Sequence, residues 1–448
     1  MAYESEADDT ADVVGVGFGP ANLALAIALR ERASAESAAA VFKARFFEKQ
    51  QEFGWHRGML IDGATMQVSF LKDLVTPRNP TSRFGFLSYL HAKGRFATFL
   101  NRKSFYPLRT EFHDYLAWAA DQLADDVDYG SEVVEIRPVT DARGTTAAVD
   151  VVVRGQGALS TVRTRAIAVA SGLEPVLPAG IEAGDRIWHS SDLLYQAEKA
   201  ATGTPARFVV VGAGQSAAEV VGYLHERFPQ AEVHAVFARY GFSVADDSSF
   251  TNEVFDPVAV DRYFTSPPDV KAMLLDYHSN TNYAVVDDDT IRDLYDRVYR
   301  ESLSGVRRLH VHNVSRVRGQ EVGTDDVNVR LEFLPTGDVT AVRADAIVYA
   351  TGYRPGDPLR LLGELGTRCL RDERGNIQVG RDYRVRTTDD VKVDIFLQGS
   401  TEHSHGISSS LLSNVAVRAG EIADALEASG RPARHPRNRS SSVSLTEH

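Results

Sequence analysis

Glycines near the start of the chain are spaced so that the backbone could approach a phosphate group. Gly15, Gly17 and Gly19 lie between a short apolar run and a helical pattern of apolar residues. In a strand–turn–helix context, such glycines allow a tight turn that places a pyrophosphate at the helix N-terminus. Pro20 stands where the usual pattern has its third glycine, and proline is tolerated in a first helical turn. Glu48 ends the next apolar run, where an acid can bind an adenosine ribose. The pattern favours adenine dinucleotide binding over an ordinary tight turn.

A second glycine turn follows the apolar run 208–211, with Gly212 and Gly214 opening a Gly-x-Gly-x-x-Ala match. This match to the dinucleotide pattern is the stronger of the two. The next apolar run, 233–238, ends in Arg239. An acid there would bind a ribose 2′-hydroxyl, whereas an arginine can pair with a 2′-phosphate. The arginine favours NADPH over NADH, and an exposed arginine at a strand end is the alternative. Two such turns imply two dinucleotides, FAD at the first and NADPH at the second.

Polar residues in otherwise apolar surroundings supply candidates for a substrate pocket. Gln67 and Lys72 are polar residues in the largely apolar stretch 66–74. A surface lysine on an amphipathic segment is the alternative at Lys72. Asn252 and Asn282 each stand near aromatic residues, and asparagine in that setting can equally be a turn residue.

The composition is that of a globular protein and excludes several functional classes. Of the 448 residues, 43% are hydrophobic and 25% are charged, and this length predicts two or three folded units. The net charge of -12 argues against a nucleic-acid partner held by phosphate contacts. No apolar run approaches the roughly 20 residues of a membrane helix, and the acidic N-terminus does not resemble a signal peptide. The single cysteine, Cys369, excludes an intrachain disulfide and a cysteine metal site, and no metal site is expected. We expect a cytoplasmic protein with neither a membrane nor a nucleic-acid partner.

The order of the expected elements predicts an α/β fold with two Rossmann-like dinucleotide-binding domains. We expect a discontinuous FAD-binding domain at 12–204 and 345–429, with an NADPH-binding domain inserted at 205–250 and 300–344. A small, mostly helical substrate-binding region is expected at 251–299. Residues 1–11 and 430–448 are poor in large apolar residues and are expected to be disordered.

Apolar periodicity predicts individual elements within these domains. Helices are expected at 112–123 and 411–426. Strands are expected at 133–139, 149–153, 166–170, 345–349 and 393–397. The strand at 345–349 meets an Ala-Thr-Gly turn at 350–352, which supports FAD binding because such turns occur in flavoproteins with two dinucleotides.

Longer motifs identify a family that the chain resembles. They are GFGPANL at 17–23, WHRGM at 55–59, MQVSFLKDL at 66–74, NEVF at 252–255, ATGY at 350–353 and HGIS at 405–408. In these motifs, including the departure at Pro20, the chain resembles the flavin-dependent N-hydroxylating monooxygenases over nearly all of residues 12–426. These enzymes hydroxylate the terminal amine of ornithine or lysine in siderophore biosynthesis. The runs RNPTSRF at 78–84 and NYAVV at 282–286 look more like the ornithine branch than the lysine branch.

The resemblance implies a role for each matched position. Lys72 and Asn252 would hold the carboxylate and α-amino end of the substrate. Asn282 would assist them and touch the nicotinamide ribose, and Gln67 would lie beside the flavin ring, which makes these two the implied catalytic residues. The substrate side chain would meet the flavin at a wall formed by Ser408, Ser410 and Leu411. The implied cofactor-binding residues are Gly15, Gly17, Gly19, Pro20, Glu48, Lys49, Trp55, His56, Gln67, Gly212, Gly214, Gln215, Ser216, Arg239, Tyr283, Thr351, Gly352, Tyr353 and Ser408.

The resemblance also implies the chemistry. NADPH would reduce FAD, O2 would add to give a C4a-hydroperoxyflavin, and the neutral terminal amine of L-ornithine would take one oxygen atom to give N5-hydroxyornithine. Bound NADP+ would remain to shield the flavin. Because a free alkyl amine titrates near pH 10.4, roughly as lysine does, activity is expected to rise above neutral pH. A homo-oligomer is expected, with a tetramer favoured.

Alternatives within and beyond this family stay open on the sequence alone. Lysine or a diamine such as putrescine or cadaverine could replace ornithine, because one methylene discriminates by only roughly 10–200-fold. A Baeyer–Villiger or sulfur monooxygenase would keep both glycine turns but lack the FLKDL run at 70–74. A flavin disulfide reductase needs a cysteine pair, which this chain lacks. A nucleotide sensor would bind both cofactors without forming product.

Overall fold

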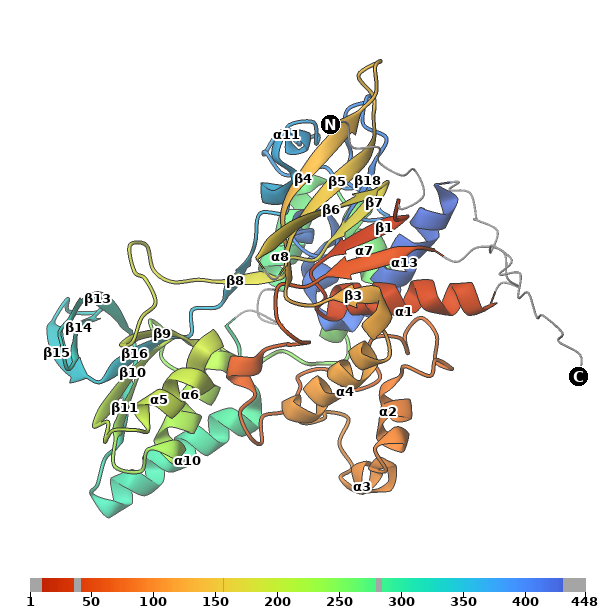
Figure 1. Ribbon diagram of the computed structural model, residues 1–448. Helices are drawn as coiled ribbons and strands as arrows, with labels where there is room; N and C mark the ends of the chain where they lie inside the picture. Colours follow the sequence, from red (N-terminus) through yellow and green to blue (C-terminus); the bar gives the residue numbers. More distant parts are fainter. Residues whose placement is uncertain (1–9, 36–41, 156, 279–283, 430–448) are drawn as a thin grey trace, which may run out of the picture.

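The computed structural model describes residues 10–35, 42–155, 157–278 and 284–429, and within them it shows a mixed α/β fold (Figure 1). The described residues form two five-stranded parallel sheets, each covered by helices on one face and by an antiparallel sheet on the other. The predicted α/β class is confirmed. No helix in the described part of the chain combines the length and the hydropathy needed to cross a bilayer.

The first sheet has the strand order β18-β7-β1-β2-β3. Its strands are β1 (Val13–Val16), β2 (Ala44–Phe47), β3 (Val127–Asp128), β7 (Ala166–Val169) and β18 (Asp394–Leu397). Residues of β1, β7 and β18 are buried throughout, as expected for parallel strands covered on both faces. Helices α1 (Pro20–Ala35) and α13 (Val415–Ala428) pack together on one face. The antiparallel strands β4 (Ser131–Thr140), β5 (Thr146–Gly155) and β6 (Ala158–Thr164) lie against the other.

The second sheet has the strand order β12-β11-β10-β16-β9. Its strands are β9 (Ile187–His189), β10 (Arg207–Val211), β11 (Glu232–Val236), β12 (Leu309–His312) and β16 (Ala346–Tyr349). One face is covered by α5 (Leu193–Ala200), α6 (Gln215–Arg227) and α10 (Asp288–Ser304). The antiparallel strands β13 (Ser315–Val322), β14 (Val327–Phe333) and β15 (Val339–Ala344) cover the other.

Sheet membership corrects the expected domain limits at two places. The expected boundaries at 204 and 345 place β9 and β16 with the first sheet, but both strands pair in the second. The expected boundary at 299 falls inside α10, which packs against α6 and β12. An apolar run predicts a buried strand but does not indicate which sheet the strand joins. The predicted boundaries therefore placed these strands in the wrong sheet. The assignment of the two sheets to FAD and NADPH stays a prediction.

The two sheets are connected by a short antiparallel ribbon. β8 (Leu173–Pro175) pairs with β17 (Tyr353–Pro355), so the chain leaves the first sheet and returns to it at neighbouring points. Figure 1 shows β8 on this path between the two sheets. Most of the polypeptide between these strands therefore forms the second sheet and its cover as an insertion, whereas α7 (Pro257–Thr265) contacts α12 (Glu402–His405), which follows β18.

The remaining helices lie outside the sheets. Among the described residues they are α2 (Phe86–Ala92), α3 (Phe96–Asn101), α4 (Arg109–Asp121), α7 (Pro257–Thr265), α8 (Pro268–Tyr277), α11 (Gly363–Gly366) and α12 (Glu402–His405). The predicted helix at 112–123 is confirmed as α4, and the predicted strands at 133–139 and 149–153 are confirmed as β4 and β5. The predicted helix at 411–426 begins later, at Val415, because residues 407–414 form two short 3-10 turns, η6 (Ile407–Ser410) and η7 (Leu412–Asn414).

Candidate cofactor and substrate sites

The first glycine turn has the geometry that a phosphate-binding turn requires. Gly17 has a φ of +80°, and a Cβ there would lie 2.5 Å from the carbonyl oxygen of Ala170. A Cβ at Gly15 would lie 2.1 Å from the Phe46 ring. A Cβ at Gly19 would meet no described atom within 4 Å, so space is open in front of the helix that begins at Pro20. The residues fit a pyrophosphate at the N-terminus of α1.

Glu48 and Asn22 fix this turn from two sides. The two carboxylate oxygens of Glu48 accept hydrogen bonds from the backbone N–H groups of Phe18 (2.8 Å) and Gln50 (2.9 Å). Glu48 is therefore held at the end of β2, where a ribose acceptor is expected. The buried Asn22 amide donates to the Gly17 carbonyl oxygen (2.7 Å) and the Ala168 carbonyl oxygen (3.2 Å). Asn22 belongs to the GFGPANL motif, but no role was assigned to it from the sequence.

The second glycine turn is closed by the segment before α10. A Cβ at Gly212 would lie 2.4 Å from the carbonyl oxygen of Ala350, and one at Gly214 would lie 3.3 Å from the Ala284 Cα. Arg239 is exposed and donates a hydrogen bond to the Ala284 carbonyl oxygen (3.1 Å). Because Gly214 and Arg239 both meet Ala284, the structure brings the expected phosphate turn and the expected 2′-phosphate partner together.

Gln215 has a structural contact that the sequence did not predict. Its side-chain oxygen accepts from the Asp287 backbone N–H (2.9 Å), and its amide group donates to the carboxylates of Asp287 and Glu219. Gln215 thus holds the start of α10 against α6. Ser216 follows it and is half-buried.

The expected substrate residues converge from three segments. The Lys72 ammonium lies 5.9 Å from the centroid of the Phe255 ring. Phe255 shares the 3-10 helix η4 (Thr251–Phe255) with Asn252, whose amide donates to the Asp247 carbonyl oxygen (2.7 Å). Helix η4 in turn contacts η6, which carries Ser408 and Ser410. The structure therefore joins Lys72, the Asn252 helix and the expected flavin wall.

The structure describes some of the other predicted site residues but not all of them. Gln67 is exposed, Ser408 is buried, Ser410 is exposed and Leu411 is half-buried. Asn282 and Tyr283 lie outside the described residues.

An aromatic group forms at the junction of the two sheets. The Trp55 and His56 rings lie 4.6 Å apart, and the His56 and Tyr353 rings lie 6.1 Å apart. Thr351 donates through its hydroxyl to the Val176 carbonyl oxygen, and the Gly352 carbonyl oxygen lies 3.0 Å from Nε2 of His189. These predicted cofactor residues are therefore neighbours of the β8–β17 ribbon. Lys49 is exposed.

Buried polar atoms gather just before α13. Among the described residues, the side-chain hydroxyls of Thr401, Ser409 and Ser413 and both polar atoms of Asn414 are buried without a hydrogen-bond partner. A buried polar atom without a partner is costly, so each such atom calls for an explanation. Five such atoms on one short segment fit a polar ligand that would complete them, such as the ring edge of a flavin. This segment includes the expected wall at 408–411.

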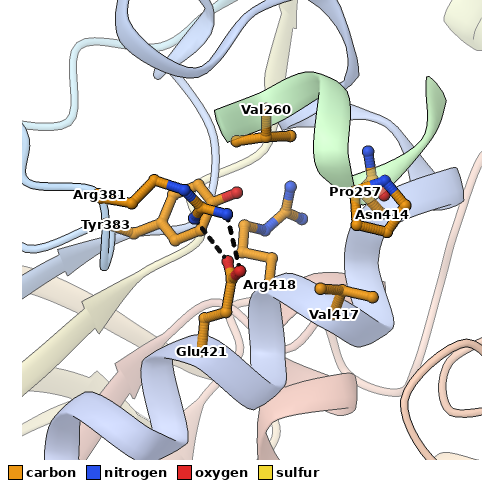
Figure 2. Close-up of a pocket in the computed structure, with 8 residues that line it drawn as sticks. All are labelled: Pro257, Val260, Arg381, Tyr383, Asn414, Val417, Arg418 and Glu421. Atoms are coloured by element: carbon orange, nitrogen blue, oxygen red, sulfur yellow. Dashed lines mark hydrogen bonds and ion pairs between the residues drawn. The ribbon is translucent and has the colours of Figure 1, made fainter. Parts of the chain in front are cut away.

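A buried arginine connects this segment to the first turn. Arg418 is 2% exposed and donates to the Ser409 carbonyl oxygen and to the Gln398 side chain (3.4 Å). The Gln398 amide donates to Oδ1 of Asn22 (2.8 Å). Figure 2 shows Arg418 beside the ion pair of Arg381 and Glu421, whose hydrogen bonds are 2.9 and 2.8 Å long. The sequence did not point to Arg418, because its partners are distant along the chain.

Comparisons with known proteins agree with this arrangement. A sequence model of the family "L-lysine 6-monooxygenase/L-ornithine 5-monooxygenase" matches residues 9–355. The fold is similar to that of the Kutzneria sp. 744 ornithine N-hydroxylase solved with reduced FAD, NADP+ and L-ornithine. The TM-score is 0.89 at 48% identity, covering 94% of this chain and 99% of that one.

Two further relatives support the match. The chain is 41% identical over 406 residues to an L-ornithine N(5)-monooxygenase of Burkholderia cepacia, covering 88% of this chain and 89% of that protein. An L-lysine 6-monooxygenase of Pseudomonas syringae has a TM-score of 0.82 at 34% identity, covering 94% of this chain and 100% of that one. The resemblance inferred from the motifs is confirmed, and the chain belongs to the L-lysine 6-monooxygenase/L-ornithine 5-monooxygenase family.

Proposed function

We propose that the protein hydroxylates the terminal amine of L-ornithine to N5-hydroxyornithine, using FAD, NADPH and O2. The observation that supports this most is the convergence of Lys72, the η4 helix of Asn252 and the η6 turn of Ser408 and Ser410. A lysine ammonium and an asparagine amide are suited to a carboxylate and an α-amino group. The substrate would then be held at its amino-acid end, with its side chain reaching toward the flavin.

Similarity to the relatives favours ornithine over other amines. The ornithine N-hydroxylase of Kutzneria sp. 744 is 48% identical to the chain, whereas the L-lysine 6-monooxygenase of Pseudomonas syringae is 34% identical. Lysine, putrescine and cadaverine remain the alternative substrates of the same site. A Baeyer–Villiger or sulfur oxidation is the second alternative.

The residues of each turn have a proposed task. The first glycine turn and Glu48 would hold the FAD pyrophosphate and ribose, and the unpaired polar atoms at 401–414 would bind the flavin edge. The second turn and Arg239 would hold NADPH and retain NADP+. When bound, the reduced flavin supplies an activated oxygen atom from O2. The protein itself orients the amine, keeps it uncharged by partial desolvation and excludes water. Activity should therefore rise above neutral pH.

We also propose the biological setting of the reaction. The product would supply a hydroxamate siderophore or a related natural product, and the enzyme would act in the cytoplasm. A homo-oligomer, with a tetramer favoured, is the proposed assembly.

Exchange of Lys72 for methionine tests the substrate assignment. Putrescine is ornithine without its carboxylate, so the variant should lose kcat/KM for ornithine by roughly ten- to hundredfold, as when a charged hydrogen bond is lost. It should change kcat/KM for putrescine far less. Lys199→Met, at an exposed position on α5, is the matched control and should change neither. An equal loss for both amines would show that Lys72 does not bind the carboxylate.

A further inference from the structure

We propose that Glu232, His234 and His310 form a binding site for a divalent metal ion of the zinc class. The site lies in the second sheet, on strands β11 and β12. Nucleotides bind at the carboxyl ends of parallel strands. Glu232 is instead the first residue of β11, so the site is set back from the Gly212–Gly214 turn.

The register of the two strands brings the three side chains together. His234 on β11 stands directly opposite His310 on β12. Glu232 is two residues before His234 and therefore points to the same face of the sheet. One potential ligand atom from each residue lies within 4.8 Å of the other two. Imidazole and carboxylate are ligands that zinc accepts.

His310 supplies an independent observation in favour of a metal ligand at this site. Its Nε2 atom is buried and has no hydrogen-bond partner among the described residues. The ring is stacked on His234 at 4.5 Å between centroids and 11° between planes. An unsatisfied buried ring nitrogen is costly, and a metal ion would satisfy it.

His312 orients His234 for this role. Nδ1 of His234 lies 2.9 Å from Nε2 of His312, while Nε2 of His234 lies 3.4 Å from the Glu232 carboxylate. When a metal binds Nε2 of His234, the ring proton must be on Nδ1, from which it can donate to His312. Hydrogen bonds of this kind fix the orientation of metal-binding imidazoles.

The geometry also sets what binding requires. In a tetrahedral zinc site with bonds of about 2.0–2.1 Å, ligand atoms lie about 3.4 Å apart. Small side-chain rotations must therefore draw the three atoms together, and water takes the fourth position. Arg207 already bonds Oε2 of Glu232 at 2.7 and 2.6 Å, so the ion must share this carboxylate with a cation. Sharing weakens binding without abolishing it.

The proposed ion would join the edge strand β12 to β11. The sequence did not indicate this site, because Glu232 and His234 are separated from His310 by more than 70 residues and only the strand pairing brings them together.

Zinc binding to the FAD-loaded full chain tests the proposal. After removal of metals with a chelator, equilibrium dialysis with elemental analysis should find one zinc ion per chain at micromolar free zinc. His310→Gln and Glu232→Gln should each weaken binding at least tenfold. His310→Cys keeps a zinc ligand and should retain binding. His91→Gln, at an exposed position on α2, is the control and should bind as the wild type does.

Circular dichroism and bound FAD confirm that each variant is folded, and two ligand positions are tested so that one unfolded variant does not decide the result. Absence of stoichiometric zinc from the wild type would overturn the proposal. So would equal affinity in wild type, His310→Gln and Glu232→Gln.

Discussion

Arg239 is the residue to which we assign the proposed preference for NADPH over NADH. Its guanidinium is exposed and contacts Ala284, which lies against Gly214. In the sequence, the position of Arg239 at the end of an apolar run predicted a contact with the 2′-phosphate of NADPH. The structure shows in addition that Arg239 lies near the second glycine turn. Hydrogen bonds to charged groups contribute about 1.5–3 kcal/mol.

Arg239→Gln should therefore raise the KM for NADPH by roughly ten- to hundredfold while leaving the KM for NADH nearly unchanged. Steady-state NAD(P)H oxidation measures both constants. Arg227→Gln, at an exposed position at the end of α6, is the matched control. An equal rise for both nucleotides would contradict the assignment of a 2′-phosphate to Arg239.

His405 makes stability depend on pH. Burial, followed by the nearby charges of Arg381 and Arg418, lowers its pKa from 6.5 to about 3. The unfolded chain takes up a proton as the pH falls through 6.5, and the folded chain excludes it. The stability contribution of the neutral ring is therefore complete above pH 6.5 and is lost as the pH falls toward 3.

His405→Phe keeps an aromatic ring against Tyr383, whose ring centroid lies 4.1 Å from that of His405. Below pH 6.5, the unfolding free energy of the variant should fall less steeply with pH than that of the wild type. The difference in slope should be up to about 1.4 kcal/mol per pH unit, which corresponds to one proton. Urea unfolding at pH 6.5, 5.5 and 4.5 measures the slope. Parallel curves for variant and wild type would show that His405 is not the group involved.

Some residues of the candidate site stand out in the sequence, and others do not. Gly15, Gly17 and Lys72 stand in local motifs whose chemistry can be recognised in a short window. Asn22 and Arg418 act through Ala168, Gln398 and Ser409, which are distant in the chain. Such partners become visible only when the sheet and α13 are in place.

Helix α4, which packs against α1, contacts α6 on the second sheet. Arg109 on α4 makes two hydrogen bonds of 2.8 and 2.7 Å to the Glu219 carboxylate on α6. Their side chains are only 13% and 8% exposed, and Glu219 also accepts from Gln215 at the second turn. When one member of a buried pair is removed, the other is left as an uncompensated charge.

Glu219→Gln should therefore lower stability by about 3 kcal/mol. Glu226→Gln removes an exposed carboxylate on the same helix, 3.5 Å from Arg297, and should cost less than about 1 kcal/mol. The midpoint of urea unfolding compares the two variants. Equal midpoints would show that the α4–α6 ion pair does not stabilise the contact between the two parts.

Elements were easier to predict than their partners. The strands at 166–170 and 393–397 were expected and exist as β7 and β18, because buried parallel strands read as short apolar runs. The sheet that β9 and β16 join is decided by pairing across long sequence separations, which periodicity does not encode. The same limit hid the β11–β12 pairing that assembles Glu232, His234 and His310.

The whole molecule contains two parallel sheets that each carry a strand–glycine turn–helix unit. Each glycine turn lies between a buried parallel strand and a helix, and the β8–β17 ribbon connects the two sheets. The α/β class was predictable because each turn carries its own strand–turn–helix pattern. The exact division of the chain was not, since β9 and β16, the outermost strands of the insertion along the chain, are short apolar runs like those of the first sheet.

We propose that this architecture serves the hydroxylation of ornithine. The most direct measurement is hydroxylamine formed per NADPH consumed by the purified FAD-loaded protein, with ornithine, lysine and putrescine compared in parallel. We expect tightly coupled hydroxylamine formation with ornithine and much weaker or uncoupled turnover with the other two. NADPH consumption that yields peroxide and no hydroxylated amine from ornithine would contradict it.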